Sequence, residues 1–157
     1  MARERGYSDV ESGRTDRRVR TGNKGVEMDN IIKMRLAMKD SPEGDWIQEA
    51  WVPKMGDRTK EGLILKVYPG HLYIVSLHRR YNVSKEHVLW LPSIEDCLGM
   101  VDWDNEERYA TLFRLDGKFA INLGRSRVFY GLSWAECWLQ VVQHIVKSLS
   151  WDREGWR

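Results

Sequence analysis

The strongest constraint on the fold is a turn signal at Asp116-Gly117, which separates two runs rich in apolar residues. This dipeptide accepts the positive φ angles that a two-residue hairpin turn needs, so it predicts an antiparallel β-hairpin. The turn also fixes the register, and three pairs should share one face of the hairpin: Arg114 with Phe119, Leu112 with Ile121, and Ala110 with Leu123. That face is apolar except for Arg114, whose aliphatic stem can cover Phe119.

A strong amphipathic helix follows the hairpin and a third strand at Arg127–Tyr130. Ser133 and Glu136 form a capping-box pattern, which marks where a helix begins. After them, apolar residues recur at three- and four-residue steps: Trp134, Cys137, Trp138, Val141, Val142, Ile145 and Leu149. We expect this stripe to pack on the hairpin face, because the hairpin is the nearest apolar surface.

The middle of the chain, residues 41–92, predicts a small β-rich module. Gly62–Tyr68 and His71–His78 flank the turn signal Pro69-Gly70 and read as a hairpin. Trp46–Val52 and Val88–Leu91 are further strand candidates, and residues 79–82 are expected to form a turn. Short strands at this spacing predict a small bent sheet or a partly open barrel. The fold class is therefore α+β, with residues 93–157 forming a second module packed on the first.

The ends of the chain carry weaker signals. Residues 1–27 contain too few apolar side chains to compensate for the entropy of ordering them, so we expect a disordered tail with mixed charge. Residues 28–40 predict a short, methionine-rich helix that docks loosely on the core. A second short helix over 94–100 should begin at Ser93, with Asp96 at the capping-box position. Trp151 and Trp156 in the C-terminal tail are expected to fold back on the core.

Composition excludes several classes of protein. The net charge is +2, and residues 1–27 hold seven basic against five acidic side chains, which leaves 18 of each in the rest of the chain. A neutral body is weak support for nucleic-acid binding. Two cysteines are too few for a disulfide framework, and no apolar run is long enough to span a membrane, so we expect a cytoplasmic protein.

Motifs for catalysis are absent. The four histidines have no neighbours at metal-ligand spacing, and no phosphate-binding glycine pattern or nucleophile elbow occurs. The acidic run 102–107 is expected to be a solvated linker, although a small metal-dependent hydrolase that uses it is a second alternative. We therefore predict a protein that is not an enzyme and has no cofactor and no metal site.

Two motifs resemble parts of a known group of proteins. Trp51-Val52-Pro53 with Gly56-Asp57, and later Trp90-Leu91-Pro92 before a short helix, resemble uncharacterised small phage and prophage proteins of Gram-positive bacteria. The resemblance covers about residues 46–149 and implies no established activity, so it assigns no catalytic residue. It implies that the protein is encoded by a phage or prophage.

Eight tryptophans in 157 residues favour recognition of another macromolecule, because tryptophan is enriched at binding hot spots. The first expectation is a protein partner bound by a surface of aromatic side chains: Trp51, Tyr68, Tyr81 and Trp90. The alternative is nucleic-acid binding through the tail and through basic residues at the turns: Arg79, Arg80, Lys85, Arg125 and Arg127.

Overall fold

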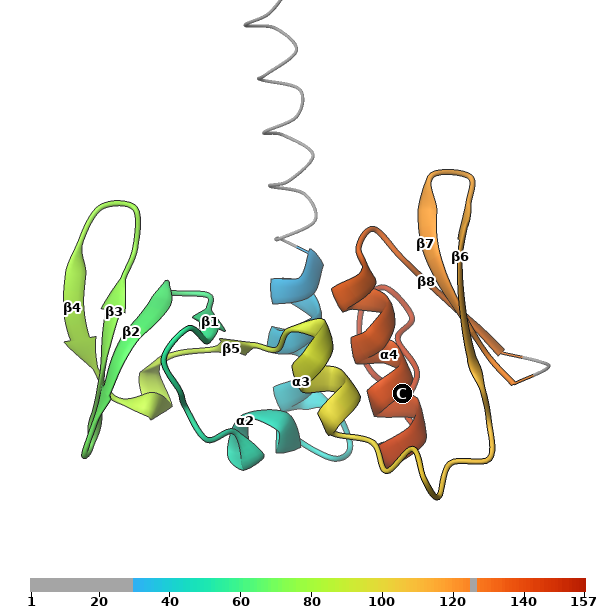
Figure 1. The fold of residues 1–157 in the computed structure, drawn as a ribbon, viewed down its shortest axis with the longest axis horizontal. Coiled ribbons are helices and arrows are strands. Elements are labelled where there is room, and N and C mark those ends of the chain that lie inside the picture. Colours follow the sequence, from blue (N-terminus) through green and yellow to red (C-terminus); the bar gives the residue numbers. More distant parts are fainter. Residues whose placement is uncertain (1–29, 125–126) are drawn as a thin grey trace, which may run out of the picture.

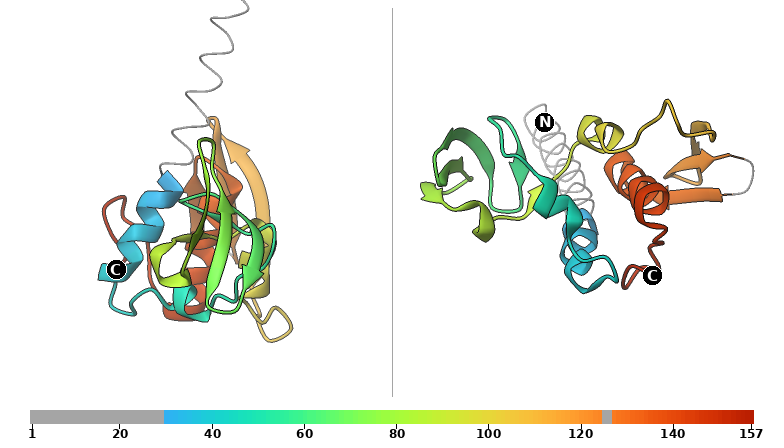
Figure 2. Two further views of the ribbon diagram at one scale, coloured as in Figure 1. Left: turned by 90° about the vertical axis from the view of Figure 1, so that its left-hand side faces the viewer. Right: turned by 90° about the horizontal axis from the view of Figure 1, so that it is seen from below.

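A computed structural model describes residues 30–124 and 127–157 of the chain. The predicted disordered tail at 1–27 lies outside these residues. Over the described residues the protein is an α+β fold in which two antiparallel sheets lie at opposite ends of a central layer of helices (Figure 1). The views in Figure 2 show the same arrangement from the side and from below.

The first sheet has five short strands in the order β4-β3-β2-β1-β5 and curls into a half-barrel. Its strands are β1 (Arg58–Thr59), β2 (Leu63–Tyr68), β3 (His71–Val75), β4 (Arg80–Val83) and β5 (Trp90–Leu91). A single 3₁₀ turn, η2 (Lys85–His87), connects the last two strands. The structure confirms the predicted bent sheet and the hairpin around Pro69-Gly70, where Gly70 has a φ of 83°.

Two local predictions for this half are wrong. The predicted strand Trp46–Val52 is instead α2 (Trp46–Ala50), because the carboxylate of Asp45 accepts a hydrogen bond from the backbone of Gln48 and starts a helical turn. Residues 79–82 do not form a turn, since the chain reverses earlier, where the backbone N–H of Ser76 donates to the carbonyl of Arg79. The polar residues after this reversal pair with β3 and form β4.

The N-terminal helix is held tightly, which corrects the prediction of loose docking. Residues 30–37 are helical and continue into the 3₁₀ turn η1 (Met38–Asp40). Ile31, Met34 and Met38 are buried, and Arg35 between them is also fully buried. The helix therefore contributes a central part of the core.

The second sheet confirms the predicted hairpin and its register. The strands β6 (Ala110–Leu115) and β7 (Lys118–Leu123) pair in the expected register, and β8 (Arg127–Gly131) completes the sheet in the order β6-β7-β8. The Arg114 guanidinium lies 4.3 Å from the Phe119 ring centroid, as expected for a stem that covers the ring. The short helix α3 (Ile94–Gly99) begins with the predicted capping box at Ser93.

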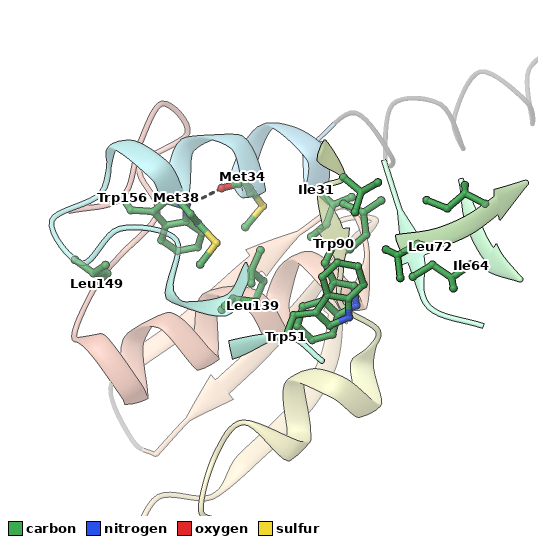
Figure 3. Packing of buried hydrophobic residues seen from close by; sticks show 14 residues of the cluster. Ile31, Met34, Met38, Trp51, Ile64, Leu72, Trp90, Leu139, Leu149 and Trp156 are labelled. Carbon is green, nitrogen blue, oxygen red and sulfur yellow. Dashed lines mark hydrogen bonds between the residues drawn. The ribbon is translucent and has the colours of Figure 1, made fainter. Parts of the chain in front are cut away.

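The helix α4 (Trp134–Lys147) is buried on two sides. On one side, Cys137, Trp138, Val141 and Val142 pack with apolar residues of β7 and β8, which confirms the expected seal between helix and hairpin. On the other side, Leu139 joins a second buried cluster, which reaches from Ile31 to Trp156 (Figure 3). The Trp156 indole donates a hydrogen bond of 2.9 Å to the carbonyl of Met34, so the C-terminal tail folds back as predicted.

Candidate functional site

Two of the four aromatic residues expected at a contact surface are buried instead. Trp51 and Trp90 are 3% and 6% exposed, and their rings stack with centroids 5.5 Å apart and planes 7° from parallel (Figure 3). The Trp51 indole N–H donates to the Asp57 carboxylate at 2.9 Å. The stacked pair holds the start of the half-barrel against β5, so these two indoles do not form an exposed contact surface, contrary to the prediction.

The other two aromatic residues lie on opposite faces of the half-barrel. Tyr81 is paired with Ile74, whose side chain is fully buried, so Tyr81 faces inward and packs against the core. Tyr68 is paired with His71 and faces outward, where 37% of its surface is exposed. The four predicted residues therefore do not come together in one surface.

Cross-strand pairing assembles a different set of residues on the outer face of the half-barrel. Side chains that are directly opposite in neighbouring strands share a face of a sheet. The pairs that include Leu63, Tyr73 and Tyr68 lie on the face of the sheet that is turned away from the buried side chains of Ile64 and Ile74. Three rows result, which we call the outer face: Arg58, Leu63, Val75 and Arg80; then Lys66, Tyr73 and Asn82; then Tyr68 and His71.

The charges of the outer face all have the same sign. Arg58, Lys66 and Arg80 are exposed, and none of the residues in the three rows carries a carboxylate. Arg79, directly before β4, does not belong to this face, because its guanidinium carbon is 4.3 Å from the centroid of the inward-facing Tyr81 ring. A surface of this kind attracts anions, because no negative side chain within the three rows compensates the positive ones.

Aromatic rings lie among these cations. The rings of Tyr68 and His71 stack with centroids 4.8 Å apart and planes 16° from parallel, and the Lys66 ammonium is 5.1 Å from the Tyr68 centroid. Tyr73, half-buried, lies in the next row. The left panel of Figure 2 looks toward the end of the molecule that the half-barrel forms. The outer face thus combines cations with planar groups on which other rings can stack.

The basic residues predicted for nucleic-acid binding are divided by the structure. Arg79 and Arg80 lie at the half-barrel. Lys85 is used internally, since its ammonium donates to the Trp51 carbonyl. Arg127 lies in β8 at the other end of the molecule, where its guanidinium contacts the Ser150 hydroxyl and lies 5.3 Å from the Phe129 ring centroid (Figure 1). Arg125 is outside the described residues.

Sequence reasoning missed Arg58, Lys66, His71 and Tyr73. Simple alternation along residues 62–68 places Lys66 on the same face as Ile64, and Arg58 lies in no predicted strand. Their convergence depends on the pairing of β1 with β2 and on the register shift between Ile64 and Lys66 in β2, which no local signal revealed. The missed residues therefore became recognisable only once the sheet was assembled.

Chemical groups for catalysis do not converge in the described part of the chain. Among residues 30–124 and 127–157, no three His, Cys, Asp or Glu side chains are grouped so that they could hold a metal ion. Burial raises the pKa of both the Cys97 and Cys137 thiols to about 12, so both are protonated near neutral pH and unsuited as nucleophiles. None of the described helices is both long and apolar enough to cross a membrane.

The surroundings of His144, on α4, lower its pKa. Desolvation by burial lowers its pKa, and the nearby charges of Arg127 and Arg108 lower it further. Its ring lies 5.5 Å from that of Phe129, and Nε2 is 3.3 Å from the Arg108 guanidinium. The lowered pKa favours the neutral form of the imidazole, which packs between α4 and β8.

Comparison with models of known protein families, with curated proteins and with solved structures finds no match.

Proposed function

We propose that the protein is a non-enzymatic binding protein whose outer face binds single-stranded nucleic acid. The observation that carries this proposal is the combination of exposed Arg58, Lys66 and Arg80 with Tyr68 on one face free of carboxylates. Proteins that bind single strands without strong sequence preference use positive charge along the backbone together with aromatic rings that stack on the bases.

The geometry favours single strands over duplexes. Tyr68 and Tyr73 project from neighbouring strands of a curved sheet, and such rings stack only on bases that are not already stacked in a helix. Small curled sheets that bind oligonucleotides do so through the faces of their central strands, and β2 and β3 hold the corresponding place in this sheet. A fold by itself does not imply a function, so the charges and rings of the outer face carry the proposal.

The test is fluorescence anisotropy with labelled single-stranded DNA and RNA of about 16 nucleotides, the upper range of a single small barrel. Unmodified protein should bind, and Tyr68→Ala should weaken binding by about 1–3 kcal/mol, which is a factor of roughly 5 to 150. Replacing Lys66 with Gln should weaken binding of every sequence and reduce the slope of log affinity against log salt by about 0.7, if one phosphate contact is lost.

The matched control is Tyr130→Ala. Tyr130 is 46% exposed and lies in β8, on the other sheet. The variant therefore removes a similarly exposed ring far from the outer face. It should leave affinity unchanged. No binding at low salt, or equal losses for Tyr68→Ala and Tyr130→Ala, would contradict the proposal. Circular dichroism of each variant verifies that the fold is retained.

A protein partner is the second candidate, and a different surface favours it. A pocket of about 360 Å³ is lined by Trp46 and Met100 together with the small exposed parts of Trp51 and Trp90, and Val52 at its edge is 81% exposed. Binding here would depend weakly on salt and would survive Tyr68→Ala, which distinguishes it from nucleic-acid binding. Origin from a phage or prophage, which the sequence resemblance suggests, stays a prediction.

A further inference from the structure

The strand β6 is an open edge of the second sheet. Within residues 30–124 and 127–157, the order β6-β7-β8 leaves one side of β6 without a neighbouring strand. The helix α4 packs against β7 and β8, so β6 extends beyond the region that the helix covers. Figure 1 shows β6 at the end of the molecule opposite the half-barrel.

This edge strand is also apolar on both of its faces. Leu112 is paired with Ile121 on the side toward α4 and is nonetheless 48% exposed. Leu115, on the opposite face, is also 48% exposed, and Tyr109 directly before the strand is 86% exposed. Edge strands that remain unpaired are usually short or carry charges that prevent pairing, and the only charged residue within β6 is Arg114.

The hairpin determines which backbone groups of β6 are free. In a two-residue hairpin, the residues that flank the turn form a hydrogen-bonded pair, here Leu115 with Lys118, and hydrogen-bonded pairs then occur at every second position. The bond from the Gly124 N–H to the Tyr109 carbonyl, 2.9 Å long, continues this alternation. The N–H and C=O groups of Ala110, Leu112 and Arg114 therefore point away from β7.

We propose that the protein forms a symmetric dimer in which the β6 strands of two copies pair antiparallel, with Leu112 opposite Leu112 of the second copy. The two sheets would then form one continuous six-stranded sheet. A twofold axis perpendicular to a sheet always places one residue opposite its own copy, so only a few registers can form between strands of this length.

Side-chain pairing selects among these registers. With Leu112 at the centre, Leu112 lies opposite its own copy and Tyr109 lies opposite Leu115, so apolar pairs form at the axis and on each side of it. A centre at Phe113 places Tyr109 opposite the turn residue Gly117, and a centre at Thr111 places Arg108 opposite Arg114. Loss of an apolar pair weakens pairing and like charges opposite each other oppose it, so the register centred on Leu112 is favoured.

The first experiment measures the mass of the full chain in solution by light scattering and by sedimentation over a range of concentrations. Unmodified protein should be a dimer. Leu112→Lys places two ammonium groups opposite each other at the axis, and it should raise the dimer dissociation constant about tenfold or more. The matched control Val128→Lys alters a residue of β8 that is 37% exposed, and it should leave the mass unchanged.

A second experiment tests the register. In this arrangement Tyr109 and Leu115 form a non-hydrogen-bonded pair with Cα atoms about 4.5 Å apart, within the range of a disulfide. The double variant Tyr109→Cys/Leu115→Cys should therefore form a covalent dimer under mild oxidation, while Cys97 and Cys137 stay unreactive because they are buried. Leu115→Cys alone should not cross-link, because its copy lies about 20 Å away along the strand.

Three outcomes would overturn the proposal: unmodified protein that is a monomer at every concentration, a dimer that Leu112→Lys leaves intact, or a single Leu115→Cys variant that cross-links as well as the double variant. Because the outer face lies on the other sheet, Leu112→Lys should still bind nucleic acid per monomer, so failure of this proposal is distinct from failure of the proposed function.

Discussion

Arg35 shows at the scale of a single residue how the core tolerates charge. Its guanidinium is fully buried, and it donates to the Trp90 carbonyl at 2.8 Å, to the Asp45 carboxylate at 2.6 Å and to the Gln48 side-chain carbonyl at 3.2 Å. These bonds satisfy most of its donors and join the N-terminal helix to α2 and β5. A buried charge with this many partners is retained because removal of one partner leaves the others unpaired.

We expect Arg35→Met to lower the free energy of unfolding by about 3–5 kcal/mol, because the Asp45 carboxylate is then left buried without its counter-charge. Urea denaturation followed by tryptophan fluorescence measures the change. Lys33→Met, on the exposed side of the same helix, is the control and should change stability by less than about 0.5 kcal/mol. A loss below about 1 kcal/mol for Arg35→Met would show that the guanidinium network contributes little to stability.

The turn between β1 and β2 shows at the scale of an element why one glycine is required. Gly62 has a φ of 152°, and a Cβ atom at this position would lie 2.4 Å from the carbonyl oxygen of Val75 in β3. The backbone of β3 cannot retreat without breaking its pairing with β2 and β4. The close approach of this turn to β3 also sets the position of Arg58 on the outer face.

Gly62→Ala should therefore destabilise the protein by about 3 kcal/mol or more, since it adds a clash with backbone to an unfavourable φ. The same change at Gly99 should have the opposite sign, with a gain of about 0.4–1 kcal/mol, because Gly99 ends α3 with open space around its Cα. Thermal unfolding of both variants makes the comparison. Equal effects would mean that the turn adapts to a side chain.

At the scale of the whole molecule, the two sheets share one layer of helices. The cluster that lines the half-barrel includes Leu139 of α4 and Trp156 of the tail, while the opposite side of α4 packs on the second sheet. The strands of each sheet fall within one of the two predicted modules, but the buried clusters cross the boundary at residue 93. We infer that the two halves unfold together.

Leu139→Ala tests this coupling, because Leu139 is fully buried at the junction. This substitution should lower the free energy of unfolding by about 2–5 kcal/mol. Hydrogen exchange should accelerate to a similar extent in β3 and in β7, although the two strands lie in different sheets. Leu77→Ala, at a residue that is 97% exposed, should change neither the free energy of unfolding nor the exchange rates. Faster exchange in only one sheet would show that the halves unfold separately.

Local chemistry by itself determined part of this structure. The Asp116-Gly117 turn fixed the register of β6 with β7, and Ser93 fixed the start of α3. Ser133 did the same for α4, where its hydroxyl accepts from the Glu136 N–H. Each of these features depends on groups within a few residues of one another, so the interaction energy that decides them is present in the sequence itself.

Tertiary pairing decided the rest. The Trp46 side chain is held by a hydrogen bond from its indole to the side-chain carbonyl of Gln143, 97 residues away. Whether Trp51 is exposed depended on stacking with Trp90. The charge of the candidate site also depended on tertiary pairing. The chain after residue 27 is neutral overall, and only the alignment of β1 to β4 gathers Arg58, Lys66 and Arg80 on one face. Side chains alternate across a sheet, so charges that balance along the chain are sorted by face once the register is set.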